Sequence, residues 1–329
     1  MYMSERSILV TGATGSFGKE FIRTVLKNYN PKRLVVYSRD ELKQYEMQEL
    51  YPQTGPLRYF IGDVRDESRL EMAMRGIDTV IHAAALKQVP AAEYNPFECV
   101  RTNIHGAENV VNASIRCGVE RVIALSTDKA ANPINLYGAT KLASDKIFIA
   151  GNSLCPPNGT RFSVVRYGNV LGSRGSVLPL FKKLIEAGET TLPITDERMT
   201  RFWITLSQGV DFVIRSLDRM HGGEIFIPKL PSMRIIDLAK ATLPNCELKS
   251  IGIRPGEKLH EIMIPLEESR MALEFDDHYV LEPAFPFWSK DSYIEQNECR
   301  RVGEGFEYSS ETNEWFMAAE ELQDFIKDF

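Results

Sequence analysis

The chain has 329 residues, which is enough to bury one large hydrophobic core or two modest ones. Its 43% hydrophobic and 26% charged residues are ordinary for a globular protein, and its net charge of -6 argues against nucleic acid as the main partner. There is no apolar run of membrane-spanning length, no signal-peptide pattern and no paired cysteine motif, so we expect a cytoplasmic protein with reduced thiols.

Apolar runs alternate with helical patterns along the first half of the chain. Continuous runs of β-forming residues predict strands at 7–12, 33–39, 58–64, 78–85 and 119–127. Helical periodicity predicts helices at 16–28, 67–75 and 103–117, the last ending before Gly118. Because the strands are continuous rather than alternating, we expect them to be buried on both faces of a parallel sheet. The pattern predicts an α/β fold with a doubly wound parallel sheet.

The composition changes after Arg166, where a segment rich in Gly and Ser precedes new helical patterns. A strand is predicted at 222–228 and a helix at 233–243, while the last 70 or so residues show only weak periodicity. We therefore expect a dinucleotide-binding domain of residues 1–170 plus about 205–230. A smaller, discontinuous α/β substrate domain would contain about 171–204 and 231–329.

A glycine-rich turn follows the first predicted strand. "TGATGSFG" places Gly12, Gly15 and Gly18 in a G-x-x-G-x-x-G pattern directly before an amphipathic helix. Such a turn lets a pyrophosphate approach backbone N–H groups at the positive end of the helix. The cofactor contacts expected in this loop are Gly12, Thr14, Gly15, Ser16, Phe17 and Gly18.

The end of the second predicted strand selects between the two nicotinamide cofactors. An acidic residue there binds the ribose 2′-OH of NAD, whereas an arginine accommodates the 2′-phosphate of NADP. Ser38 and Arg39 occupy this place and Lys43 follows one turn later, which predicts NADP. Asp40 keeps NAD open as the alternative.

A tyrosine and a lysine four residues apart follow the fifth predicted strand. On a helix Tyr137 and Lys141 would share one face, and the lysine ammonium would lower the pKa of the phenol. Tyr137 is then a candidate base for a substrate hydroxyl during hydride transfer. From these two residues alone, a core tyrosine beside a solvated lysine is the alternative.

These motifs together resemble the extended short-chain dehydrogenases/reductases. The chain is similar in particular to the UDP-N-acetylglucosamine 4,6-dehydratases that invert C5, which open pseudaminic acid and related amino-sugar pathways in bacteria. The matching segments span about residues 8–261 and include "VTGATGSFG", "YSRDE", "HAAALKQVP", "STDKAANPINLYGATK", "RYGNVLGSRGSVLPLF", "MTRFWIT" and "RPGEKLHE".

The resemblance implies a division of labour around the fifth strand. Dehydratases that retain C5 carry Asp-Glu where this chain has Asp128 and Lys129, so Asp128 would protonate the leaving 6-hydroxyl and Lys129 would remove the C5 proton. A lysine base must be partly neutral, so we expect burial and a nearby cation to lower its pKa from about 10.4. Tyr137 would serve C4, Lys141 would also hold the nicotinamide ribose, and Thr127 would bind near the 4-hydroxyl.

The resemblance also assigns binding residues. Further cofactor contacts are expected at Asp63, Val64, Ala83, Ala84, Ala85 and Val170. Contacts to UDP-N-acetylglucosamine are expected at Lys87, Asn169, Arg174, Gly175, Ser176, Val177, Thr191, Arg201, Arg254 and Glu257. Arginine can form a bidentate fork to phosphate, which suits the diphosphate. The histidines and cysteines show no metal-ligand spacing, so no metal is predicted.

Three other functions stay open from the sequence. The chain could be a UDP-sugar 4-epimerase, a dehydratase for a related UDP-sugar, or a non-catalytic NADP-binding regulator. Only a dehydratase releases water, and a regulator would typically lack the Tyr137–Lys141 pair. Extended members of the superfamily often self-associate, so we expect a homo-oligomer, either a dimer or a hexamer.

Overall fold

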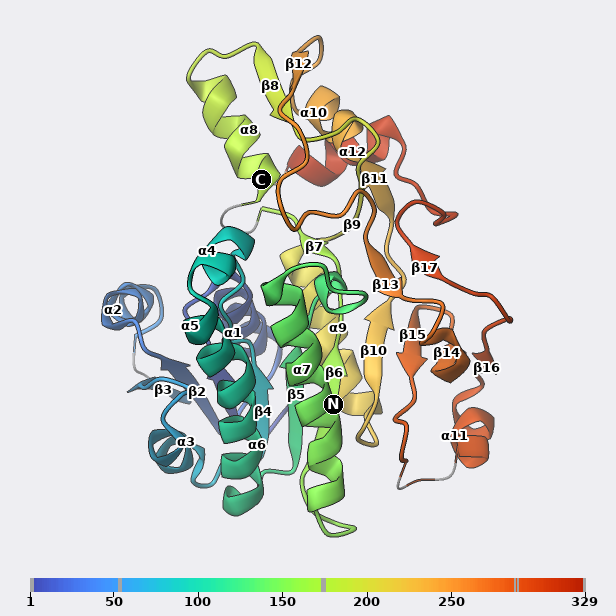
Figure 1. Ribbon diagram of the computed structural model, residues 1–329. Coiled ribbons are helices and arrows are strands. Elements are labelled where there is room, and N and C mark those ends of the chain that lie inside the picture. The colour runs from blue at the N-terminus through green and yellow to red at the C-terminus, as the bar shows by residue number, and fades with distance from the viewer. Residues whose placement is uncertain (1–2, 53–54, 173–175, 287, 289, 328–329) are drawn as a thin grey trace.

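The computed structural model describes residues 3–52, 55–172, 176–286, 288 and 290–327. Its main body is a 10-stranded sheet with helices on both faces, and a smaller lobe stands over the carboxyl ends of the parallel strands (Figure 1). In spatial order the strands of this sheet are β16 (Arg300–Arg301), β14 (Ala272–Glu274), β15 (His278–Leu281), β10 (Ile225–Pro228), β6 (Arg161–Val165), β5 (Arg121–Leu125), β4 (Thr79–His82), β1 (Ser7–Thr11), β2 (Arg33–Ser38) and β3 (Leu57–Ile61).

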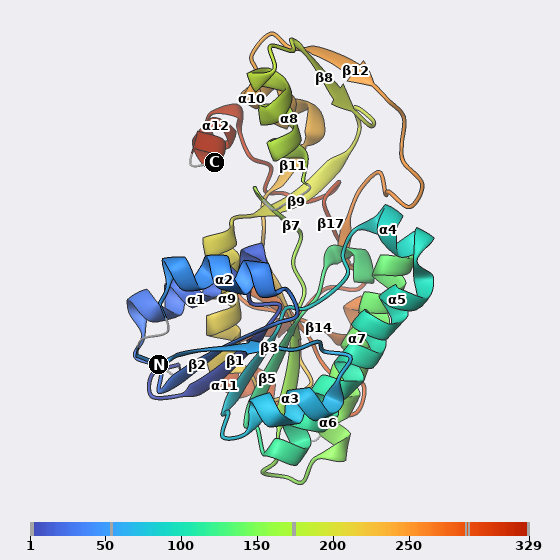
Figure 2. The same cartoon turned by 90° about the vertical axis from the view of Figure 1, so that its left-hand side faces the viewer.

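In this spatial order, the neighbouring strands β10, β6, β5, β4, β1, β2 and β3 all run parallel. This arrangement confirms the doubly wound α/β fold. Helices α1 and α9 cover one face, while α3, α6 and α7 cover the other (Figure 2). The helices of this body are α1 (Ser16–Asn28), α2 (Glu41–Leu50), α3 (Glu67–Met74), α4 (Val89–Tyr94), α5 (Pro96–Val100), α6 (Gly106–Cys117), α7 (Leu136–Gly151), α9 (Leu206–Arg219) and α11 (Lys290–Asn297). Shorter helical segments are a π-helix at Arg101–His105 and 3-10 helices at Asp128–Ala130, Asn152–Leu154 and Ser269–Met271.

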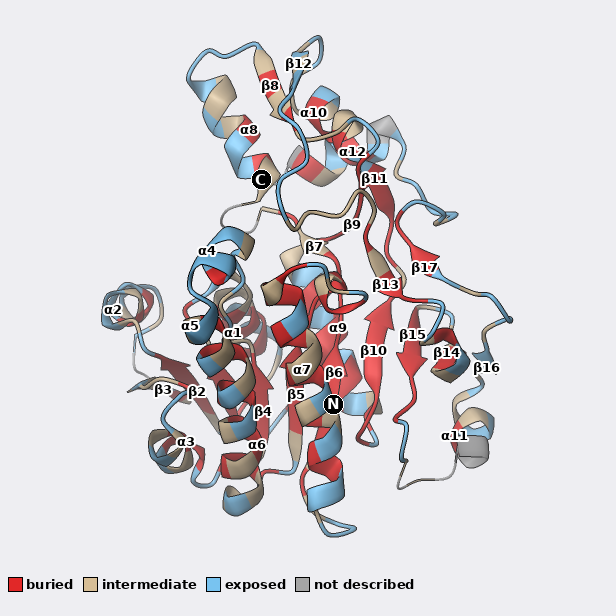
Figure 3. Cartoon of the chain, in the orientation of Figure 1, coloured by how far each residue is buried: buried red, intermediate tan, exposed pale blue. Residues whose placement is uncertain are grey.

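Burial follows the position of each strand in the sheet (Figure 3). Strands β1 and β4 are buried along their whole length, and β2 and β5 along all but the first residue, because helices cover both of their faces. Strand β3 departs from the expectation of burial on both faces, since Arg58 and Ile61 are exposed. The reason is its place at the edge of the sheet, where it has β2 as a neighbour on one side.

Three antiparallel strands extend the main sheet beyond β10. Strand β15 pairs with β10, β14 pairs with β15, and β16 pairs with β14. The sequence-based division assigned residues 231–329 to the smaller domain, whereas these strands continue the main sheet. The pairing of β15 with β10 joins segments about 50 residues apart, which local periodicity does not encode.

The smaller lobe has a hydrophobic cluster of its own, which includes Phe181, Trp203, Leu238 and Leu322. Its elements are β7 (Asn169–Val170), α8 (Val177–Glu186), β8 (Thr191–Ile194), β9 (Thr200–Ile204), β11 (Ser232–Arg234), α10 (Ile235–Thr242), β12 (Glu247–Ser250) and α12 (Ala319–Lys327). Strands β13 (Ile262–Ile264) and β17 (Tyr308–Ser309) pair with each other beside the junction of lobe and body. No helix in the described part of the chain is long and apolar enough to cross a membrane.

Candidate active site

The glycine loop between β1 and α1 has the geometry of an anion cradle. Gly12 has a φ of +65°, and a Cβ there would lie 2.9 Å from the backbone of Ala84. A Cβ on Gly18 would lie 2.4 Å from the backbone of Ala13. Gly15 caps α1 without a side chain, and the first turn of this helix holds no acidic residue, so its N–H groups can receive a pyrophosphate. The other predicted loop residues lie in the same turn: Thr14, Ser16 and Phe17.

The end of β2 lies beside this loop. The hydroxyls of Ser38 and Thr14 are hydrogen-bonded at 2.8 Å. The Asp40 carboxylate caps α2 by accepting from the backbone N–H of Lys43 at 3.0 Å, and it also pairs with the Lys43 ammonium. The Arg39 guanidinium, in contrast, is more than half exposed. Asp40 is therefore engaged by its own helix, while Arg39 is partly exposed beside the Asp63 carboxylate.

Two further predicted cofactor contacts, Asp63 and Val64, follow the end of β3. The Asp63 carboxylate pairs with Arg65 at 2.7 Å and with Arg39 at 3.5 Å. Val64 is buried, and its carbonyl accepts from the Asn109 side chain at 3.0 Å. Asp63 therefore stands next to Arg39, and Val64 follows it just after the carboxyl end of β3.

The "HAAA" segment follows β4 and packs against the glycine loop. The N–H of Ala83 donates to the Thr11 carbonyl at 3.2 Å, and the N–H of Ala84 contacts the Thr11 hydroxyl at 3.3 Å. Ala85 and Lys87 follow on an exposed stretch that leads into α4. These bonds fix the backbone that closes over Gly12.

A charged cluster follows β5. Thr127 donates to Asp128 Oδ1 at 2.8 Å, and Asp128 itself is fully buried. The Lys129 Nζ lies 3.0 Å from Asp128 Oδ1, 3.3 Å from Asn169 Oδ1 and 3.2 Å from Glu261 Oε1. The structure thus brings the predicted Asp-Lys pair together with Asn169 from β7.

Helix α7 carries the Tyr-Lys pair against this cluster. Tyr137 and Lys141 are both buried, and Asn135 caps the helix by accepting from the Gly138 N–H at 2.8 Å. A Cβ on Gly138 would lie 2.1 Å from the carbonyl oxygen of Lys129. The glycine therefore allows the backbone of the base candidate to lie directly on the helix that carries the tyrosine.

The electrostatics of Tyr137 differ from the prediction. Burial dominates and raises the pKa of Tyr137 to about 12, while the charge of Lys129 and a hydrogen bond with Thr127 act to lower it. The prediction that Lys141 lowers this pKa is not met, because Lys129 is the cation that acts on the phenol. Burial lowers the pKa of Lys141, and the carboxylate of Asp145 offsets part of that effect.

The electrostatics of Lys129 also reverse the prediction. Burial acts to lower the pKa of Lys129, but the carboxylates of Asp128 and Glu261 together outweigh it and raise this pKa. Arg201 is the nearby cation that opposes them. The prediction considered the cation and the burial, but it omitted the second carboxylate.

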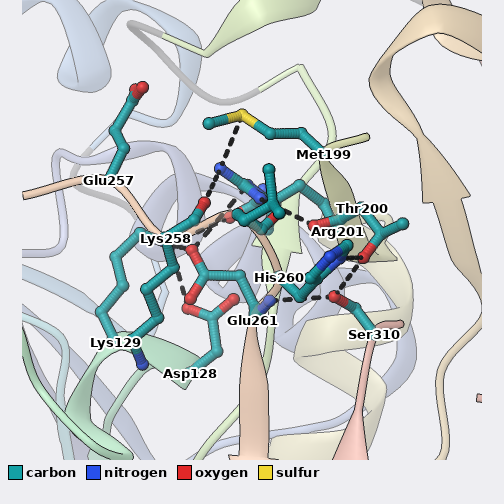
Figure 4. A network of polar contacts seen from close by, with 12 residues as sticks. Asp128, Lys129, Met199, Thr200, Arg201, Glu257, Lys258, His260, Glu261 and Ser310 are labelled. Atoms are coloured by element: carbon teal, nitrogen blue, oxygen red, sulfur yellow. Dashed lines mark hydrogen bonds and ion pairs between the residues drawn. The ribbon is translucent and has the colours of Figure 1, made fainter. Parts of the chain in front are cut away.

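Arg201 ties β9 to the segment at 254–261 (Figure 4). Its Nη1 donates to the carbonyls of Thr200 at 2.7 Å and Leu259 at 3.0 Å, and its Nη2 donates to the carbonyl of Lys258 at 3.0 Å. Its Nε lies 3.8 Å from Glu261 Oε1. Arg201 therefore joins the charged cluster.

Other predicted substrate residues lie outside this cluster of contacts. Arg254 pairs with Glu257 at 3.7 Å, and the Thr191 hydroxyl, at the start of β8, donates to Glu247 at 3.4 Å. Val170 lies on β7 beside Asn169, and Ser176 and Val177 stand at the start of α8. Two predicted contacts fall outside the described residues: Arg174 and Gly175.

Two site residues escaped the sequence analysis. Glu261 ends the "RPGEKLHE" segment, is almost completely buried and contacts Lys129. Lys258, in the same segment, donates to the carbonyl of Ala131 at 2.6 Å, just after the 3-10 helix that holds Asp128. The available signal was an acidic residue at the end of a matched motif, directly before a short apolar strand.

Comparisons with known proteins agree with this geometry. The family model described as Polysaccharide biosynthesis protein matches residues 8–283. A UDP-N-acetylglucosamine 4,6-dehydratase (inverting) of Campylobacter jejuni is 56% identical over 328 residues, which cover 98% of each chain. A UDP-glucose 4-epimerase of Rickettsia conorii is 42% identical over 84% of this chain and 82% of its own. The X-ray structure of Pen from Bacillus thuringiensis has a TM-score of 0.89 at 35% identity, covering 100% of this chain and 98% of that chain.

These similarities extend over both the sheet with its glycine loop and the smaller lobe. They confirm the resemblance that the motifs predicted, including the segment after about residue 265 where no motif had been recognised. The chain belongs to the polysaccharide biosynthesis protein family, within the extended short-chain dehydrogenases/reductases.

Proposed function

We propose that this protein is a hydro-lyase that acts on UDP-N-acetylglucosamine. The product would be UDP-2-acetamido-2,6-dideoxy-β-L-arabino-hex-4-ulose, formed by loss of water and inversion at C5. The observation that carries the proposal is the Asp128–Lys129 contact of 3.0 Å, directly beside the buried Tyr137 and Lys141. The Campylobacter relative, with the corresponding name and 56% identity, supports it.

The order of events follows from the acidity of C5. Its proton becomes removable only when C4 is a ketone, because the carbanion is then an enolate. Tyr137 would accept the 4-hydroxyl proton, and the Lys129 charge and the Thr127 hydrogen bond favour its phenolate. Lys141 would hold the nicotinamide ribose. Bound NADP would supply the hydride acceptor for C4 and the hydride donor for C6.

Elimination needs Asp128 with a proton and Lys129 without one. One proton that crosses the 3.0 Å contact from Lys129 Nζ to Asp128 Oδ1 produces both forms at once. Lys129 would then take the C5 proton while Asp128 protonates the leaving 6-hydroxyl, which returns the pair to its charged state. Because the pair is neutralised internally, the raised pKa of Lys129 does not prevent it from acting as the base.

Inversion requires that C5 receives its new proton on the face opposite Lys129. We assign this step to Tyr137, which carries the proton taken from the 4-hydroxyl. The proton count then closes without an external donor, since two protons leave the sugar and two return to the sugar and the water. The pathway served would be pseudaminic acid or a related bacterial amino sugar.

The substrate contacts follow the matched motifs. The Arg254–Glu257 pair would bind the diphosphate and the uridine, with Lys87 and Asn169 near the sugar. Arg201, predicted for the same role, is buried and donates to three backbone carbonyls, so its guanidinium is not free to grip a phosphate. Thr191 and the start of α8 would close over the nucleotide from the smaller lobe. The position of Asn169, 3.3 Å from the Lys129 Nζ, supports its place beside the reacting carbons.

NADP is the cofactor that we propose. The carboxylate of Asp40 is used in capping α2 and in pairing with Lys43, which leaves it poorly placed to bind a ribose 2′-OH. The exposed guanidinium of Arg39 is suited to a 2′-phosphate. The protein would act in the cytoplasm as a dimer or a hexamer, and light scattering that gives the mass of a monomer would contradict the assembly.

One experiment tests the reaction, the substrate and the stereochemistry together. The protein is incubated with UDP-N-acetylglucosamine in D₂O, and the product is followed by NMR. We expect a 6-deoxy-4-keto sugar with deuterium at C5 and inverted configuration there. A 6-deoxy-4-keto product with retained C5 would overturn the inversion alone.

A UDP-sugar 4-epimerase is the second candidate, because the Rickettsia relative carries that name and the Tyr137–Lys141 pair would suffice for it. In the same experiment an epimerase would give the C4 epimer with an intact 6-hydroxyl and no deuterium at C5. That outcome would overturn the dehydratase. Binding of NADP and UDP without any turnover would favour a non-catalytic regulator.

A further inference from the structure

Glu261 is a buried acidic residue whose backbone is fixed by hydrogen bonds and to which the sequence analysis gave no role. Its backbone N–H contacts the Ser310 hydroxyl at 2.9 Å, and its carbonyl accepts from the Ser310 N–H at 2.8 Å. Strand β13 begins at the next residue. Glu261 is 2% exposed. Its backbone is therefore fixed by Ser310, and its carboxylate lies in the protein interior.

The carboxylate points into the charged cluster (Figure 4). Its Oε1 lies 3.2 Å from Lys129 Nζ and 3.8 Å from Arg201 Nε. Its Oε2 is buried and has no hydrogen-bond partner among the described residues, and the same holds for Oδ2 of Asp128. Two carboxylates from segments 133 residues apart in sequence therefore contact the Lys129 ammonium. Each carboxylate has a second oxygen without a hydrogen-bond partner among the described residues.

A contribution to folding stability does not explain why residue 261 is a buried glutamate. Arg201 already donates to three backbone carbonyls, so it is fixed without help from Glu261. A buried carboxylate is costly to desolvate, and an apolar residue would suit the start of a buried strand better. The contact with Glu261 instead restrains Lys129. Without it, Asp128 would be the carboxylate that orients the flexible Lys129 side chain among the described residues.

We infer that Glu261 is a positioning residue for the C5 base. It holds the Lys129 ammonium against Asp128 and Asn169, and it joins this base to the segment at 254–261 that would bind the nucleotide. The inference rests on the proposed dehydration, and it extends that proposal to a residue outside the Asp128–Tyr137 stretch. In this role Glu261 would act through Lys129 rather than on the sugar.

The charge of Glu261 gives the inference a measurable signature. Five ionisable groups face Lys129 or one another in this cluster: Asp128, Tyr137, Arg201, Lys258 and Glu261. The Glu261 charge raises the pKa of Lys129, whereas Arg201 lowers it. Neutralising Glu261 therefore lowers the pKa of Lys129, and the pH profile of the reaction should move to lower pH with it.

The test compares Glu261→Gln, Glu261→Asp and wild type in the full chain with UDP-N-acetylglucosamine. For Glu261→Gln we expect kcat to fall on the order of tenfold, because the base is less well oriented. KM should stay within about twofold, and the pH profile of kcat should move down by on the order of one unit. Glu261→Asp keeps the charge, so its pH profile should stay near that of wild type although kcat falls.

The matched control is Glu311→Gln, which removes an exposed carboxylate that contacts His260 at 3.5 Å, next to Glu261 in sequence. It should leave kcat and the pH profile unchanged. Wild-type kcat and an unshifted profile for Glu261→Gln would overturn the inference. So would an equal loss in Glu261→Gln and Glu261→Asp without a shift in pH, which would mark a structural role. If wild type forms no 6-deoxy-4-keto sugar, the proposed function fails instead.

Discussion

Gly138 is the point where the two halves of the site touch, and its replacement by alanine tests that contact. The added Cβ would lie 2.1 Å from the carbonyl oxygen of Lys129, whereas real Cβ atoms stay at least 3.0 Å away. Helix α7 and the 3-10 helix at Asp128–Ala130 must therefore separate by roughly 1 Å, since the obstacle is backbone and not a flexible side chain. This movement displaces Lys129 relative to Tyr137.

The expected costs to stability and activity differ in size. Overpacking costs about 1–3 kcal/mol, and alanine in place of a helical glycine returns about 1 kcal/mol, so the unfolding free energy should fall by roughly 0–2 kcal/mol. A displacement of about 1 Å between catalytic groups costs on the order of 100-fold in rate. Gly138→Ala should therefore fold well and turn over UDP-N-acetylglucosamine about 100-fold more slowly.

The assay pairs urea unfolding with NMR measurement of product formation, and Gly209→Ala is the control. Gly209 also lies in a helix, α9, but a Cβ there would meet its nearest atom at 3.9 Å, the Cδ1 of Ile204. This control should gain about 0.5–1 kcal/mol of unfolding free energy and keep its activity. A Gly138→Ala enzyme with kcat within twofold of wild type would refute the reasoning about the contact.

Three further predictions concern the base, the cofactor and a buried histidine. Lys129→Ala should reduce the loss of deuterium from C5-deuterated substrate at least about 100-fold, and undiminished exchange would remove Lys129 as the base. Arg39→Ala should weaken NADP binding about tenfold or more in calorimetric titration, because a charged hydrogen bond is lost, whereas equal weakening of NAD would speak against the 2′-phosphate contact. Burial lowers the pKa of His82 to about 3, so below pH 6.5 the unfolded chain takes up a proton that the folded chain refuses. Stability should then fall by about 1.4 kcal/mol per pH unit, and His82→Gln should remove that part of the slope between pH 6 and 4.5 in urea unfolding.

The sequence predicted six of the seven parallel strands, because each of them carries its own signal, and it missed β6 (Arg161–Val165). The buried strands β1, β2, β4 and β5 read as continuous apolar runs, and α1 begins and ends at the predicted residues. Strand β3 carries a similar run, yet it lies at the edge, and edge position is a property of the whole sheet. The pairings of β15 with β10 and of β16 with β14 are also non-local, so the C-terminal segment could not be assigned from periodicity.

For the candidate site, the sequence predicted which residues lie together but not their ionisation. Residues that lie in one short stretch, such as Thr127, Asp128, Lys129, Tyr137 and Lys141, were found together and occur together in the structure. Their ionisation was not predictable, because it depends on partners that arrive from elsewhere in the chain.

Lys129 illustrates why ionisation needs the fold. Local reasoning supplied burial and a cation, which favour a neutral amine, while the structure adds the carboxylate of Glu261 and reverses the direction. The reversal changes the chemistry that the lysine must perform. A lysine that begins neutral could act alone, but a lysine that begins charged needs a neighbour to receive its proton, and Asp128 at 3.0 Å is that neighbour. In the proposed elimination the acid and the base would then be a single pair that shares one proton, and Glu261 would hold Lys129 beside Asp128.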